Sequence, residues 1–130
     1  MMSKPGVAAR IVLAAALPLF LTACGGGEET VSFSQDVKPV LDENCLSCHQ
    51  DGGTGYVASG FSMASYELVM KGTRNGPMVI AGDVEGSNML VLMEGRADPS
   101  ISMPHGSMDP VASKDIEKIR SWIAQGAKNN

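Results

Sequence analysis

The chain has 130 residues, enough for one folded domain; 44% of them are hydrophobic and 18% are charged. This composition excludes a chain kept disordered by charge, and the net charge of −4 excludes the basic surface typical of nucleic-acid-binding proteins. Three Phe, two Tyr and one Trp are few aromatic residues for a core of this size, so we expect another large apolar group in the interior.

The N-terminal residues have the pattern of an export signal. Lys4 and Arg10 are positively charged and precede the apolar stretch Ile11–Leu21, which is too short to cross a membrane as a helix. The tetrapeptide Leu-Thr-Ala-Cys that ends at Cys24 resembles the bacterial lipobox, in which the cysteine is lipidated and becomes the first residue after cleavage. The alternative is an ordinary secretory signal followed by an incidental cysteine.

These features divide the chain into three parts. We predict a lipoprotein signal peptide over residues 1–23, a flexible linker from the lipidated Cys24 over residues 24–32, and one domain over residues 33–130. The protein is then anchored by its lipid to a membrane, on the periplasmic side or at the cell surface. An aspartate directly after the lipidated cysteine would resemble an inner-membrane retention signal. This chain has Gly25 at that position, which favours the outer membrane in a cell with two membranes.

The first predicted helix leads into a cysteine motif. Apolar side chains recur at helical spacing at Val37, Val40, Leu41 and Cys45. Ser34 is the expected N-cap, and Pro39 predicts an irregular first turn. The glycine-rich segment 50–55 predicts a loop after the motif.

The motif itself is a C-x-x-C-H pentapeptide, Cys45-Leu46-Ser47-Cys48-His49. This spacing is typical of covalent c-type haem attachment, in which two thiols add to the haem vinyl groups and the adjacent histidine binds the iron. From the Cys and His frequencies of the chain, on the order of 0.001 such motifs are expected by chance. Cys45, Cys48 and His49 are therefore predicted to hold one haem c.

Three other interpretations of the cysteine pair remain. A thioredoxin-like redox pair requires a βαβ setting, for which the sequence has no strand pattern. A zinc site needs four ligands, and only the distant His105 could join the three motif residues. A structural disulfide between Cys45 and Cys48 would explain neither His49 nor the export signal.

Further helices are predicted after the motif, and no segment alternates as a strand. A helix over residues 64–71 ends at Gly72, and a second over 83–94 has Asp83 as its cap. A long loop follows over residues 96–110. The last helix starts at Ser113 or Ala112 and ends at Gly126; its apolar face carries Ile116, Ile119 and Ile123, flanked by Trp122.

A second axial ligand is expected among the methionines. Met70, Met78, Met89 and Met93 lie in helical or short apolar patterns and are expected to fill the core. Met103 instead lies in a turn-rich loop, and Pro104 biases its backbone toward an extended conformation. We predict Met103 as the sixth ligand, with His105, Met108 or an open site as alternatives.

The chain resembles small class-one cytochromes c and, more narrowly, the planctomycete-type cytochrome c domain. The residues that carry this resemblance are the segments 33–41, 45–49, 82–83 with 87–90, 103–104 and 119–127. The resemblance implies an all-α cytochrome c-like fold in which the N- and C-terminal helices cross beside the haem, with His49 and Met103 as axial ligands. The chain departs from the family pattern at two positions. His105 stands where the family often has a second proline after Met-Pro, and Val84 stands where it often has a proline after Gly-Asp.

Together these features predict a membrane-tethered monohaem cytochrome c that transfers single electrons outside the cytoplasm and is not an enzyme. The haem would then be the large apolar group that fills the interior in place of aromatic side chains. Its expected partners are redox proteins of a respiratory chain and the membrane, with no nucleic acid. The alternative is a haem sensor or peroxidase-like enzyme whose sixth iron position is open or weakly held.

Overall fold

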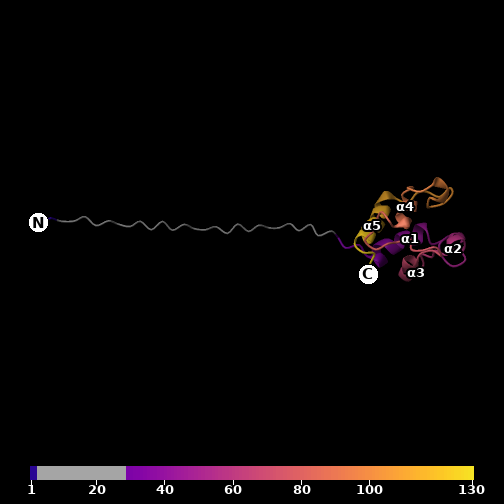
Figure 1. Ribbon diagram of the computed structural model, residues 1–130, viewed down its shortest axis with the longest axis horizontal. Coiled ribbons are helices and arrows are strands. Elements are labelled where there is room, and N and C mark those ends of the chain that lie inside the picture. Colours follow the sequence, from indigo (N-terminus) through magenta and orange to yellow (C-terminus); the bar gives the residue numbers. More distant parts are fainter. Residues whose placement is uncertain (3–28) are drawn as a thin grey trace.

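The computed structural model describes residues 1–2 and 29–130. Residues 3–23 of the predicted signal peptide and Cys24, the predicted lipidation site, lie outside these residues. In the described part the chain forms five α-helices and no strand, so the predicted all-α class is confirmed (Figure 1). The helices are α1 (Lys38–Asn44), α2 (Thr54–Ser59), α3 (Tyr66–Lys71), α4 (Asn88–Met93) and α5 (Ser113–Ala124). None of the described helices is long and apolar enough to cross a membrane.

The core is built on α5. Ile119, Trp122 and Ile123 are completely buried, and they share one cluster with Leu41 of α1 and Leu90 of α4. Burying each aliphatic side chain of this size stabilises the fold by about 1.5–3 kcal/mol. The predicted apolar face of the last helix is thus confirmed, with Trp122 at its centre. The indole Nε1 of Trp122 donates a hydrogen bond to the backbone oxygen of Lys128 at 2.9 Å.

The first helix begins differently from the prediction. Ser32, not Ser34, is the N-cap, and its hydroxyl accepts a hydrogen bond from the backbone N–H of Gln35. The hydroxyls of Ser32 and Ser34 both donate to the backbone oxygen of Asn130, at 2.8 and 2.9 Å. A π-helical turn over Phe33–Val37 precedes α1, which puts Pro39 in the first turn of the α-helix, where its missing N–H leaves no hydrogen bond unmade.

Other predicted boundaries were also wrong. The helix expected over residues 64–71 begins at Tyr66 and ends as predicted before Gly72. The loop expected over residues 50–55 ends earlier, because α2 begins at Thr54. The helix expected from Asp83 begins at Asn88. The Asp83 carboxylate accepts a hydrogen bond from the Gly86 N–H at 2.8 Å, and the Ser87 hydroxyl donates to the Asp83 backbone oxygen at 2.6 Å. Asp83 therefore closes a turn before α4 and does not cap it.

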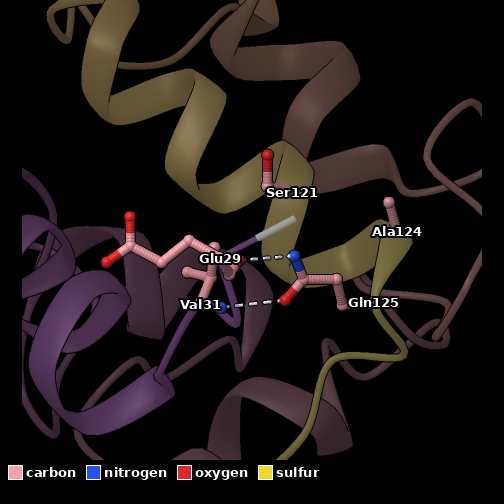
Figure 2. A pocket seen from close by; sticks show the side chains of 5 residues that line it. All are labelled: Glu29, Val31, Ser121, Ala124 and Gln125. Carbon is pink, nitrogen blue, oxygen red and sulfur yellow. Dashed lines mark hydrogen bonds between the residues drawn. The ribbon is translucent and has the colours of Figure 1, made fainter. Parts of the chain in front are cut away.

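Residues 29–32, which fall within the predicted linker, are bound to the C-terminal end of the domain. Gln125 accepts a hydrogen bond from the Val31 N–H at 2.8 Å and donates one to the Glu29 oxygen at 3.0 Å (Figure 2). The Ser34 N–H donates to the Asn130 oxygen at 3.0 Å. The N-terminal segment and the C-terminus consequently lie at one end of the domain, whereas α2 lies at the other (Figure 1).

Candidate functional site

One large cavity brings distant parts of the chain together. Its volume is about 840 Å³, within the range of small-molecule and cofactor sites. Residues from the end of α1, from α2, from the last turn of α4 and from the loop before α5 line it. None of the described residues that line it is Lys, Arg, Asp or Glu. The cavity therefore suits a large and mainly apolar group.

The cysteine motif forms one wall of this cavity. The turn after α1 is closed by hydrogen bonds from the N–H groups of Cys48 and His49 to the Cys45 oxygen, at 3.1 and 3.0 Å. Both thiols are free and, with the imidazole, line the cavity. Burial, and secondarily the neighbouring Cys48, raise the pKa of Cys45 to about 11. This thiol is consequently neutral at physiological pH.

The imidazole of His49 is fixed from two sides. It is 9% exposed, and its Nδ1 lies 3.1 Å from the backbone oxygen of Phe61. A carbonyl oxygen only accepts, so Nδ1 carries the proton and Nε2 keeps a free lone pair. Gly55 lies against the ring, where a Cβ would be 2.9 Å from Nε2. The ring is thereby held in the tautomer and orientation that a metal ligand requires.

Thioethers provide much of the remaining lining. The methionines that line the cavity are Met63, Met78, Met89, Met93, Met103 and Met108. The four expected in the core do pack there: Met89 is buried, and Met70, Met78 and Met93 contact the core cluster. Three of these four, Met78, Met89 and Met93, also line the cavity. Helical spacing does not reveal this, because a buried helix face can pack against the core and line a cavity at the same time.

The loop before α5 brings all three candidate sixth ligands to this cavity. Met103 is half-buried, and its N–H donates to the Leu92 oxygen of α4 at 3.1 Å. His105 is exposed, with Nδ1 3.3 Å from the Ser102 oxygen, and Met108 is 46% exposed. Met103 is therefore the candidate most firmly attached to the domain.

The rival interpretations of the motif find less support. In the described part of the chain no group of three or more His, Cys, Asp and Glu side chains is placed to hold a metal ion, so the zinc site lacks its ligands. The two thiols are not joined to each other, and no strand lies beside them within residues 29–130. By contrast, two thiols, an imidazole with a free lone pair and a thioether around an apolar cavity fit a covalently held haem.

Comparison with known proteins agrees with this chemistry. Residues 45–105, from the first motif cysteine to His105, match the family model described as Planctomycete cytochrome C. The matched segment supports a planctomycete-type cytochrome c domain. No curated protein and no solved structure matches the chain. A cytochrome c domain implies haem c binding and an electron-carrying role, and the matched segment contains both Cys45–His49 and Met103.

Proposed function

We propose that this protein is a monohaem cytochrome c that carries single electrons outside the cytoplasm, tethered to a membrane through a lipid on Cys24. The observation that supports it best is one cavity lined by Cys45, Cys48, His49 and Met103. A bound haem supplies an iron that gains and loses one electron. The protein then determines the reduction potential and the access of partners.

Each side chain has a separate task in this proposal. Cys45 and Cys48 would hold the haem through two thioethers. His49 would bind the iron through Nε2, while the Phe61 oxygen keeps the proton on Nδ1. Met103 would supply the sixth ligand, and its soft thioether would raise the reduction potential. One C-x-x-C-H motif in the sequence supports one haem.

The location and the partners follow from the sequence pattern. The lipobox-like tetrapeptide ending at Cys24 supports export and lipid anchoring, with the outer membrane favoured by Gly25. At that location the partners are redox proteins of a respiratory chain. The test is the distribution of the wild-type protein and of Cys24→Ser between membrane and soluble fractions.

The ligand assignment is tested on the purified protein by absorption spectra of its oxidised and reduced forms. Met103→Ala should abolish the thioether-to-iron charge-transfer band, lower the potential and allow the reduced protein to bind CO. Met103→His should give a bis-histidine spectrum with a lower potential, because imidazole favours ferric iron more than a thioether does. His105→Ala and Met108→Ala, which alter the other two candidates, should leave the spectrum nearly unchanged.

Two results would replace this assignment. If His105→Ala removes the low-spin spectrum and Met103→Ala does not, the sixth ligand is His105. If no variant changes the spectrum and the wild-type protein already binds CO, the sixth position is open. The function is then that of a haem sensor or a peroxidase-like enzyme.

A further inference from the structure

A network of charged side chains joins the end of α4 to α5. Arg120 of α5 binds Glu94, the residue that ends α4, and also reaches Glu85 at 3.4 Å. Arg96 binds the same two carboxylates, at 2.6 Å to Glu94 and 3.1 Å to Glu85. The hydrogen bond to Glu94 raises the pKa of Arg120 above its ordinary value.

Glu94 is the centre of this network. Its side chain is 14% exposed, against 74% for Glu85, so its charge is the less hydrated of the two. It also lies at the C-terminal end of a helix, where the helix dipole disfavours a negative charge. Two guanidinium groups offset both costs. If Arg120 is removed, the Glu94 carboxylate is stabilised by Arg96 alone and should turn toward water.

The same end of α4 is the base of the loop that carries Met103. The Arg96 N–H donates to the Val91 oxygen at 2.9 Å, where the chain leaves the helix. The Met103 N–H donates to the Leu92 oxygen at 3.1 Å, where the chain returns. Both attachments use carbonyls in the last turn of α4, three and two residues before Glu94, which Arg120 binds.

We propose that Arg120 is a positioning residue for the sixth ligand: through Glu94 it holds the last turn of α4 in place, and that turn holds Met103 against the cavity. This inference rests on the proposed function, because it takes Met103 as the ligand. Arg120 itself does not line the cavity and does not touch the haem site.

The test uses the purified haem-loaded protein and the variants Arg120→Met, which keeps the length of the side chain, and Arg120→Lys, which keeps the charge but not the forked geometry. Lys118→Met is the matched control, because Lys118 pairs at 3.4 Å with Asp115 on the same helix and does not reach α4. Three quantities are measured: the temperature at which the thioether band disappears, the fraction of reduced protein that binds CO at a fixed subsaturating concentration, and the temperature of global unfolding.

We expect Arg120→Met to lose the thioether band well below its global unfolding temperature. The equilibrium between open and ligated iron should shift about fivefold toward the open form, as for loss of a partly exposed ion pair. Arg120→Lys should recover part of this shift, and Lys118→Met should behave as the wild type. Glu94→Gln, which removes the charge from the other partner, should reproduce the Arg120→Met behaviour and serves if that variant does not fold.

The inference is overturned if the wild-type protein shows the thioether band and neither Arg120→Met nor Glu94→Gln lowers the temperature at which this band disappears. A band that disappears together with global unfolding in every variant also overturns it, since the network then acts only on overall stability. A wild-type protein without the thioether band overturns the Met103 assignment itself, and this inference with it. The wild-type spectrum thus separates a failure of the proposed function from a failure of the positioning role.

Discussion

Gly55 provides the most direct test of how the imidazole is held. It lies in the first turn of α2, against the ring of His49. A Cβ added there would lie 2.8 Å from Cε1 and 2.9 Å from Nε2 of His49, and 3.1 Å from the backbone oxygen of Cys48. Favourable contacts between such atoms begin near about 3.5 Å. Gly55→Ala must therefore displace either the ring or α2 by roughly half an ångström.

Two opposing effects determine the change in stability. Overpacking of this kind costs about 1–3 kcal/mol. Alanine is favoured over glycine in a helix by about 1 kcal/mol, which offsets part of that cost. We expect a net loss of about 1 kcal/mol in the free energy of unfolding, or a thermal midpoint lower by roughly 4–8 °C for a domain of this size.

The ring should respond as well as the fold. Displacement weakens the hydrogen bond from Nδ1 to the Phe61 oxygen, which makes Nε2 a less basic ligand, so the reduction potential should rise. Calorimetry and a redox titration of the haem-loaded protein measure the two effects. Val57→Ala is the control, because Val57 is in the same helix and 65% exposed. An unchanged midpoint together with an unchanged potential in Gly55→Ala would refute this account of the His49 environment.

Further predictions concern attachment, anchoring and the core. Cys45→Ser combined with Cys48→Ser should give no covalent haem and no stable fold, as measured by haem staining on a denaturing gel and by circular dichroism; a stably folded double variant without haem would contradict this. Cys24→Ser should release the protein into the soluble fraction or block processing, and firm membrane binding after normal signal removal would exclude lipidation. Trp122→Phe should cost about 1–3 kcal/mol in denaturant unfolding, because it removes the hydrogen bond to Lys128 and leaves a void in the core; a loss under about 0.5 kcal/mol would argue against this role.

The accuracy of the sequence predictions depended on the length and the chemistry of each element. Helix α5 could be predicted because twelve residues repeat an apolar period. Helix α2 was missed because its six residues include none that is buried, so no period exists to detect. The hydrogen bond from His49 to Phe61 could not be foreseen, because its acceptor is a backbone carbonyl that any residue type offers.

The N-cap shows a different limit. Ser32 and Ser34 are equally good caps by residue type. The hydroxyls of both serines donate to the backbone oxygen of Asn130, so this contact does not distinguish them. Only the Ser32 hydroxyl also accepts from the Gln35 N–H, because the helical turns begin directly after Ser32, and only the folded structure shows where they begin.

The hydrogen bonds between Ser34 and Asn130 and between Val31 and Gln125 join residues 96 and 94 positions apart in the chain. Contacts between residues so far apart in the sequence close a very long loop. They cannot form until the C-terminal partner residue has been synthesised. During synthesis, Cys45 and Cys48 emerge many residues ahead of α5, whose Trp122 completes the core. The two thiols therefore lie on an open chain until the residues around Asn130 follow, and the cavity that they line is completed only then.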